Sequence, residues 1–170
     1  MEGFLDSLDQ ALREKNWYSA LVMSLTLPDV CAKAAAPGKT SGKKYAAWFD
    51  EFVGSKYRRP VGAHKQMHTF LSGKDCYALR CALLHEGTAE IATQSAREVL
   101  DRFYFCTPGP QGNRWHQNQV GGALLLMVDE FAADILEAAR SWWASLEPAQ
   151  QDAVRKAQLV LLDADRIEGC

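Results

Sequence analysis

The chain has 170 residues, of which 48% are hydrophobic and 24% are charged, and its net charge is −2. This length suits a single hydrophobic core, and the composition excludes a disordered or fibrous protein. The N-terminus shows no secretory signal, and the longest uncharged apolar stretch, 120–128, is much shorter than the ~20 residues of a membrane span. The sequence therefore predicts one domain over residues 1–170, cytoplasmic and outside any membrane.

Positive charge is concentrated in one part of the chain. Residues 30–74 contain nine lysines and arginines but only Asp50 and Glu51 as acids, a local charge of +7. Because the whole chain carries −2, the remaining residues carry −9. Such an asymmetry can attract a polyanion, although a solvated, loop-rich surface would show the same pattern.

Apolar residues recur at helical spacing through the first third of the chain. Residues 3–14 have one apolar face, and Asn16 can cap a second helix with another. Pro28 is expected to end or restart that helix, leaving a short turn of helix through Cys31. A third helix is expected over 43–53, followed by a long polar and basic connection of the kind that is usually functional or mobile.

The segment 72–87 carries the clearest helix signals in the chain. Ser72 and Asp75 stand at the N-cap and at the third helical position, where side chains accept free backbone N–H groups. Gly87 supplies the left-handed residue that commonly ends a helix. The residues between these ends are mostly apolar, which predicts a buried helix.

The second half of the chain predicts a hairpin between helices. Residues 98–106 alternate and are rich in aromatics, and a partner strand is expected over 114–121 after a turn-forming stretch. A long helix over 123–146 and a final helix over 147–165 follow. The sequence thus predicts a mainly α fold, a helical bundle with a small β-hairpin insertion at about 98–121.

Arg80 and His85, near the end of the 72–87 helix, are the residues best suited to chemistry. An arginine on so apolar a helix is costly unless paired, and a histidine at a helix C-terminus is suited to exchanging protons. Together they can clamp a phosphate and transfer a proton, which are the parts needed for phosphodiester cleavage. Five residues of α-helix turn through about 500°, so the two side chains are expected about 140° apart and not side by side, although both can still project around the helix end toward one pocket. The structural alternative is that Arg80 pairs with an acid while His85 only caps the helix.

Metal and cofactor chemistry has little support in the sequence. The five cysteines are scattered without a CxxC pair and indicate reduced thiols. His64 and His68 could share a helical face, but no third ligand lies nearby in sequence. We therefore expect neither a metal nor a cofactor.

The Arg80-x4-His85 motif resembles the hallmark of the HEPN superfamily, small helical-bundle proteins with R-x4-6-H late in a helix. The resemblance implies a HEPN-like bundle and, as in many members, a metal-independent endoribonuclease of phage defence, toxin–antitoxin or RNA-processing systems. It implies His85 as general acid/base at the ribose 2′-hydroxyl or the leaving oxygen, and Arg80 as the group that stabilises the phosphate. Active members often have a polar residue after the arginine, where this chain has Cys81, and a variant with tyrosine two residues beyond the histidine has Gly87 here.

The expected partner is RNA, whose backbone we expect to contact the basic side chains of the long connection. These residues are Lys56, Arg58, Arg59 and Lys65. A symmetric homodimer with the 72–87 helix at or near its interface is also expected, because two motifs can form one composite site. An antitoxin or other regulatory protein is a further partner that the resemblance implies.

Two other functions stay open. A non-catalytic HEPN-like module could bind RNA, a nucleotide or a protein partner, and Cys81 favours this alternative. A helical structural protein without a nucleic-acid role is the third, and the basic stretch argues against it.

Overall fold

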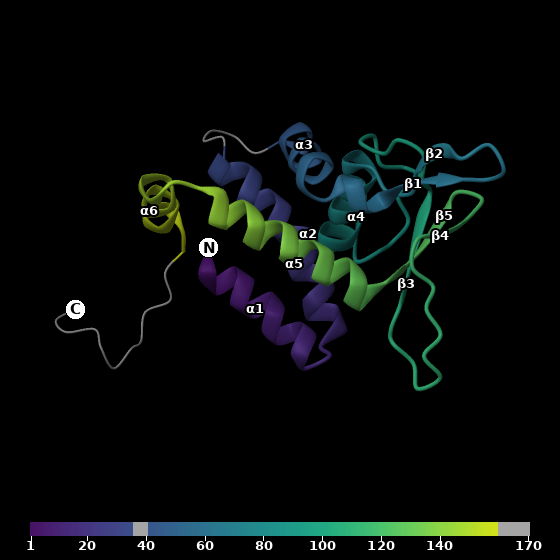
Figure 1. The fold of residues 1–170 in the computed structure, drawn as a ribbon, viewed down its shortest axis with the longest axis horizontal. Helices are drawn as coiled ribbons and strands as arrows, with labels where there is room; N and C mark the ends of the chain where they lie inside the picture. The colour runs from purple at the N-terminus through teal and green to yellow at the C-terminus, as the bar shows by residue number, and fades with distance from the viewer. Residues whose placement is uncertain (36–40, 160–170) are drawn as a thin grey trace.

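The computed structural model describes residues 1–35 and 41–159, and helices make up most of them (Figure 1). The core helices are α1 (Glu2–Arg13), α2 (Trp17–Ala35), α3 (Gly42–Phe52), α4 (Gly73–Cys81) and α5 (Val128–Ser145). Helix α2 lies at the centre and packs against the other four. Each turns its apolar stripe inward, as Leu8 in α1 and Phe131 in α5 show, and both of these are fully buried. The predicted mainly α fold is confirmed at this level.

Pro28 does not end the second helix, so that prediction is wrong. Helix α2 continues through Pro28 to Ala35. Proline removes one backbone hydrogen bond from a helix, but the Pro28 ring is buried against the core. Burial of the ring and of its neighbour Leu27 offsets the lost bond.

The predicted helix over 72–87 forms two different helical segments. Helix α4 is capped by Ser72, whose Oγ accepts the backbone N–H of Asp75 at 3.1 Å. It continues directly into a π-helical turn, η2 (Ala82–Glu86), which ends at Gly87 with φ +69°. The capping predictions for Ser72 and Gly87 are therefore confirmed, while the π turn is a feature that the sequence did not indicate.

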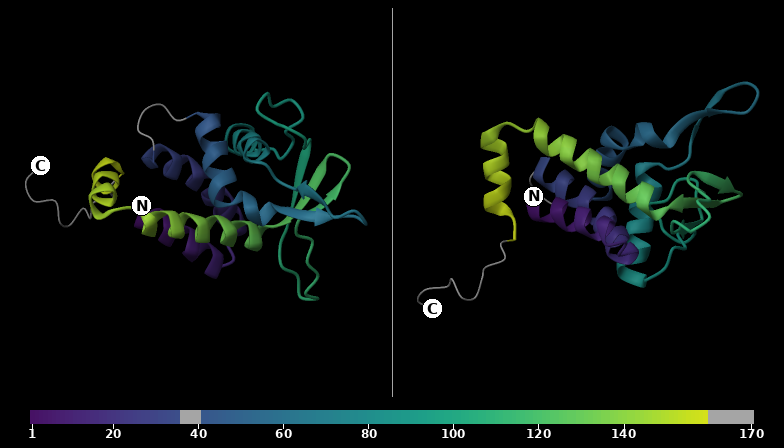
Figure 2. Two further views of the ribbon diagram at one scale, coloured as in Figure 1. Left: turned by 45° about the horizontal axis from the view of Figure 1, so that its top comes forward. Right: turned by 60° about the horizontal axis from the view of Figure 1, so that its bottom comes forward.

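The long basic connection is ordered as a hairpin. After a short 3₁₀ turn, η1 (Gly54–Tyr57), strands β1 (Arg58–Val61) and β2 (Gln66–Thr69) pair antiparallel and project from the bundle (Figures 1 and 2). Every residue of the two strands is exposed or half-buried, so their sequence lacks the alternation of apolar and polar residues that indicates a strand with one buried face.

The predicted hairpin at 98–121 is wrong in its pairing. Strand β3 (Arg102–Cys106) pairs parallel with β5 (Ala123–Met127), and β4 (Asn118–Val120) pairs antiparallel with the other edge of β5. The predicted helix from 123 therefore begins only at Val128. Residues 123–127 are a continuous apolar run, and such a run cannot be assigned to helix or strand by its periodicity.

The last helix lies across one end of the bundle, beside the N-terminus (Figure 2). Helix α6 (Pro148–Ala157) begins with proline in its first turn as predicted, and the predicted residues 160–165 lie outside the described chain. Arg155 bonds to Glu2 at 2.8 Å and ties α6 to α1. This hydrogen bond lowers the pKa of Glu2 to about 2.

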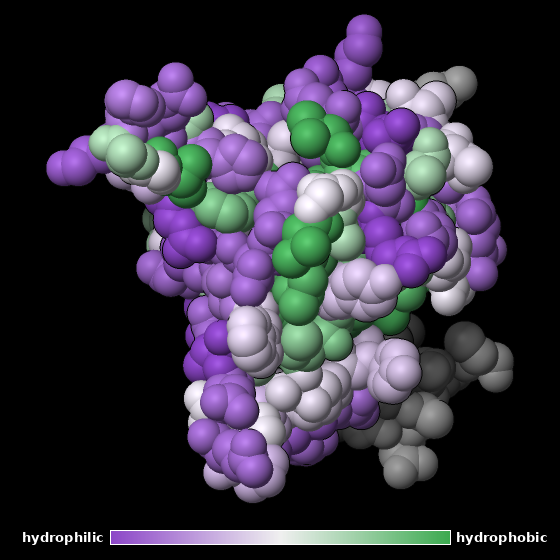
Figure 3. Space-filling view, turned by 90° about the vertical axis from the view of Figure 1, so that its right-hand side faces the viewer, coloured by the Kyte–Doolittle hydropathy of each residue, from purple (hydrophilic) through white to green (hydrophobic). Residues whose placement is uncertain are grey.

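The strands form the opposite end of the molecule. Seen from this side, the surface is mainly hydrophilic, with a narrow hydrophobic stripe near its centre (Figure 3). Exposed apolar side chains on the strands include Met67, Tyr104 and Val120. Within residues 1–35 and 41–159, no helix is both long and apolar enough to cross a membrane.

Candidate functional site

Arg80 and His85 meet at the surface end of the α4–η2 segment. The Arg80 Nη1 atom lies 3.0 Å from His85 Nε2. The expectation that the two side chains do not lie side by side is therefore wrong for their end groups, which meet around the end of the helix, where the π turn lies. The Gly87 N–H reaches the Ala82 carbonyl, five residues back, so the turn holds more residues than an α-turn and brings His85 round toward Arg80.

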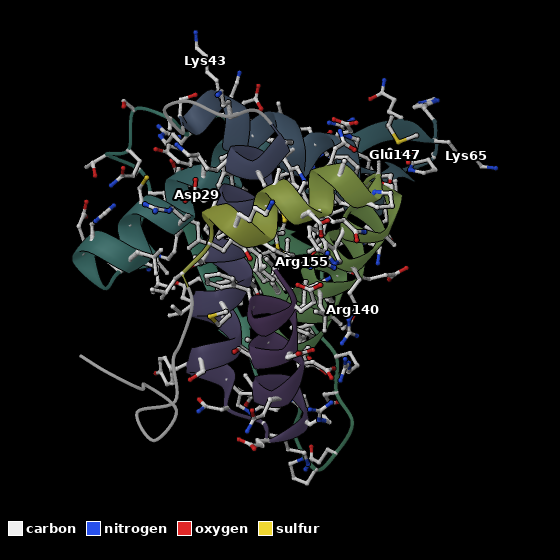
Figure 4. The ribbon with its side chains drawn as sticks, turned by 90° about the vertical axis from the view of Figure 1, so that its left-hand side faces the viewer. Asp29, Lys43, Lys65, Arg140, Glu147 and Arg155 are labelled. Atoms are coloured by element: carbon white, nitrogen blue, oxygen red, sulfur yellow. The ribbon has the colours of Figure 1, made fainter. Side chains whose placement is uncertain are left out.

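A third residue, Asp29 of α2, completes the constellation. Its Oδ2 lies 2.8 Å from Arg80 Nε, and the two side chains are only 18% and 22% exposed. Figure 4 shows Asp29 beside the teal helix that contains Arg80. Arg80 does pair with an acid, as the structural alternative expected, and it contacts His85 at the same time.

Sequence reasoning missed Asp29. No spacing rule connects two residues that lie 51 positions apart on different helices. The available signal was indirect, because a half-buried arginine requires an acidic partner from somewhere in the fold.

Burial and charge act in opposite directions on this pair. Burial alone would lower the pKa of Arg80, but Asp29 and the neighbouring Cys81 raise it overall. Burial raises the pKa of Asp29, and the Arg80 guanidinium opposes that rise. The guanidinium therefore stays charged and is fixed from one side by the carboxylate.

The contact with Arg80 defines which nitrogen of His85 carries a proton. Arginine only donates hydrogen bonds, so Nε2 must be the acceptor and the ring proton must be on Nδ1. The exposed imidazole thus directs its Nε2 lone pair at an N–H group of the Arg80 guanidinium. If the arginine moves to a phosphate, that lone pair becomes free to accept a proton.

Two tyrosines that pack against each other lie near the site, one in α4 and one in α3. Tyr77 lies one turn before Arg80, and its hydrogen bond with the Cys81 thiol is the largest cause that raises the pKa of Tyr77. Tyr45 of α3 packs against Tyr77 with ring centroids 5.3 Å apart and is fully buried. Tyr77 therefore joins the site to the buried aromatic packing between α3 and α4.

The four predicted RNA-binding residues lie in η1, the hairpin and its turn, but they differ in their contacts. Lys56 faces the bundle and bonds to Asp134 at 2.8 Å and to Glu137 at 2.6 Å. Arg58 pairs with Asp50 at 3.5 Å.

The other two residues lie further along the hairpin. Arg59 donates to the Gln117 carbonyl at 3.1 Å and stacks 4.4 Å from the Phe70 ring centroid. Lys65 projects from the exposed turn, where Figure 4 labels it at the edge of the molecule. Lys65 is thus the predicted contact most open to a ligand.

Potential metal ligands are dispersed. His64 and His68 do not share a helical face, because residues 66–69 form a strand and His68 Nε2 lies 2.8 Å from Gln119 Oε1. His116 is enclosed near Glu130 and Asp134, and burial is the main cause that lowers its pKa. Across residues 1–35 and 41–159, no group of three or more His, Cys, Asp and Glu side chains could hold a metal ion.

The candidate site therefore consists of Asp29, Arg80 and His85, with Cys81 and Tyr77 beside them. It offers a fixed cation and a proton acceptor at one exposed point, which suits recognition and cleavage of a phosphodiester. Comparison of the chain with protein-family models, curated proteins and solved structures finds no match.

Proposed function

We propose that the chain is a HEPN-like, metal-independent endoribonuclease that serves phage defence, a toxin–antitoxin system or RNA processing. The observation that carries the proposal is the 3.0 Å contact between Arg80 and His85 late in a helix. A phosphate-binding cation and a proton-transfer group thus act on the same point, and Asp29 holds the cation in place.

In the proposed reaction an RNA phosphate accepts the hydrogen bond from Arg80 that His85 Nε2 accepts in the free protein. The freed His85 Nε2 accepts the proton of the ribose 2′-hydroxyl as the 2′-oxygen attacks phosphorus. The bond to the 5′-oxygen breaks, and this leaving oxygen takes a proton from the protonated His85 of a second copy, in the homodimer proposed below. The products are a 2′,3′-cyclic phosphate and a 5′-hydroxyl end, while Arg80 stabilises the charge that develops on the phosphate.

The test is RNA cleavage in the presence of EDTA. We expect the wild-type protein to produce 2′,3′-cyclic phosphate ends and His85→Ala to cleave 10²–10⁴-fold more slowly, the usual range for loss of a general acid/base. His64→Ala is the matched control, since His64 lies in the exposed hairpin turn. Equal cleavage by all three proteins would identify a contaminating nuclease and contradict the proposal.

A non-catalytic HEPN-like module that binds RNA, a nucleotide or a protein partner is the second candidate function. Two observations favour it: Cys81 follows Arg80, and Arg80 already has two partners in the free protein. Saturable RNA binding by a wild-type protein that leaves the RNA intact would establish this alternative.

We also propose a homodimer with α4–η2 at or near its interface. Cyclisation needs a base at the 2′-oxygen and an acid at the 5′-oxygen, and one copy offers a single His85 for both roles. A two-fold axis would bring a second motif to the same cleft. We expect light scattering to give twice the 18.9 kDa mass of one chain at tens of micromolar. A monomer at that concentration would defeat the composite site.

We propose that Lys56, Arg58, Arg59 and Lys65 contact the RNA backbone. Neutralising all four should weaken RNA binding and flatten its dependence on salt, because fewer counterions are released. Of the four single substitutions, Lys56→Gln should weaken RNA binding least, since Lys56 already bonds to two carboxylates. An unchanged salt slope for the fourfold variant would remove this segment from the binding site.

A further inference from the structure

Two cavities adjoin on the side of α4 that faces α3. The larger, of about 760 Å³, is lined by residues of α3, by Tyr77 and by the segment 95–97. The smaller, of about 510 Å³, is lined by Arg58, Thr69 and residues near Glu98. Asp50 and Lys74 line both, so the two cavities are neighbours, and together they are called here the α3–α4 groove. The larger cavity alone has the size of a small-molecule site.

The groove ends beside the candidate site. Tyr77 lines the larger cavity, and its hydroxyl group interacts with the thiol of Cys81. Tyr77 and Arg80 are three residues apart in α4, so they lie on neighbouring positions of one helix face. A ligand in the larger cavity would therefore lie one helical turn from the proposed phosphate-binding guanidinium.

The groove carries cations along its whole length. Lys43, Lys74 and Arg97 line the larger cavity, and Arg58 lines the smaller one. Figure 4 shows Lys43 reaching outward from the edge of α3. Spaced cations beside an open recess suit a chain of phosphates.

The acids that line the groove, Asp50, Asp75 and Glu98, are already engaged, and Asp75 Oδ1 accepts the Glu98 N–H at 2.7 Å. Asp50 accepts the Gly73 N–H at 2.9 Å and pairs with Arg58. Glu98 pairs with Lys74 at 3.2 Å, with the side chains 45% and 60% exposed. Such exposed pairs contribute at most about 1 kcal/mol, so an RNA phosphate can displace the carboxylate from the lysine.

Between the cations the walls are made of small residues. Gly42 packs against the Tyr77 ring, where a Cβ atom would lie 2.5 Å from Cε1, and Ala46, Ala47 and Ala96 line the open space around it. Unpaired bases can turn out of a strand and enter such room, whereas the bases of a duplex are paired with one another. Cations for the backbone and space for bases are the two elements of single-strand binding.

We propose that the α3–α4 groove binds the unpaired RNA segment next to the scissile phosphate. Phosphates would lie at Lys43, Lys74 and Arg58, with a base in the larger cavity. This inference rests on the proposed ribonuclease function and gives its substrate a path from Arg80 to the hairpin.

The test measures binding of a short fluorescent RNA, unpaired or annealed to its complement, by polarisation. All proteins carry His85→Ala so that the RNA stays intact. Lys43→Gln with Lys74→Gln removes two cations, and Ala47→Trp fills the larger cavity from an exposed position of α3. The matched controls on exposed α6 positions are Lys156→Gln and Ala153→Trp, and thermal melts confirm that each variant is folded.

We expect the lysine pair to flatten the slope of log affinity against log salt by about 1.4, from two lost single-strand phosphate contacts. Ala47→Trp should weaken binding about tenfold through loss of one base contact, while both controls stay within about twofold. Unchanged RNA binding by the groove variants, or equal affinity for the unpaired and the annealed RNA, would contradict the proposal that the groove binds unpaired RNA.

The two proposals fail in different ways. If the wild-type protein cleaves no RNA but the groove substitutions still weaken RNA binding, the cleavage proposal fails and the proposal of RNA binding in the groove stands. If the wild-type protein cleaves RNA, and the groove substitutions change neither binding in the His85→Ala protein nor cleavage when His85 is kept, the groove proposal fails and the ribonuclease proposal stands.

Discussion

Replacing Arg80 with alanine is expected to slow RNA cleavage by about 10²–10³-fold, the usual cost of losing one group that stabilises transition-state charge. Arg80 is the one cation in contact with both His85 and Asp29 among the described residues. Arg80→Lys should recover only part of the rate, because an ammonium group lacks the fork that binds two phosphate oxygens. Initial rates on one RNA substrate give the comparison.

The same substitution should also lower stability, so the two effects have to be separated. Arg80→Ala removes the cation beside Asp29, whose side chain is 18% exposed in the intact protein, and we expect a cost of about 2 kcal/mol, between the values for exposed and buried pairs. Adding Asp29→Asn removes the stranded charge and should restore most of this stability without restoring cleavage.

Asp29→Asn alone tests the role of the acid. It keeps the shape of the side chain and leaves Arg80 charged, so cleavage should fall by about tenfold through looser positioning of the guanidinium. Wild-type cleavage by Arg80→Ala, or recovery of cleavage in the double variant, would contradict a catalytic role for Arg80.

The largest loss of stability is expected for Asp75→Ala. Asp75 is 2% exposed, and its Oδ1 accepts backbone N–H groups of Glu98 at 2.7 Å, Val99 at 3.2 Å and Leu100 at 3.4 Å. Its Oδ2 also accepts the Ser72 hydroxyl at 3.2 Å. One carboxylate thus fastens residues 98–100, just before β3, to the start of α4.

Without the carboxylate these backbone donors lose their acceptor inside the protein. Charge-assisted bonds contribute more than neutral ones, and unpaired buried donors are costly, so we expect a loss of about 3 kcal/mol. For a chain of this size that corresponds to a fall in Tm of about 10 °C. Denaturant and thermal unfolding measure the effect.

Two controls test the cause of this loss. Asp75→Asn keeps one acceptor oxygen and should cost less than alanine. Asp6→Ala removes an exposed aspartate from α1 and should change stability by no more than about 0.5 kcal/mol. A similar small change for Asp75→Ala would show that the segment before β3 is held by other contacts.

The sequence by itself determined where most helices lie and the two limits of the 72–87 segment. Amphipathic spacing placed α1, α3 and most of α5 to within a few residues, because each buries one stripe in a shared core. Ser72 and Gly87 marked the limits of α4–η2, since capping chemistry and left-handed backbone depend on local residues. The position of Arg80 and His85 at the end of that segment followed from the same signals.

The tertiary structure alone decided how these pieces meet. The apolar run 123–127 became a strand because β3 and β4 pair with its two edges. Strand β4 directly precedes it, but β3 is separated from β4 by residues 107–117. Asp29 reached Arg80 because α2 packs against α4. The π turn rotated His85 toward Arg80, whereas a regular α-helix would have kept them apart. Local sequence thus supplied the chemistry, and long-range packing set its geometry.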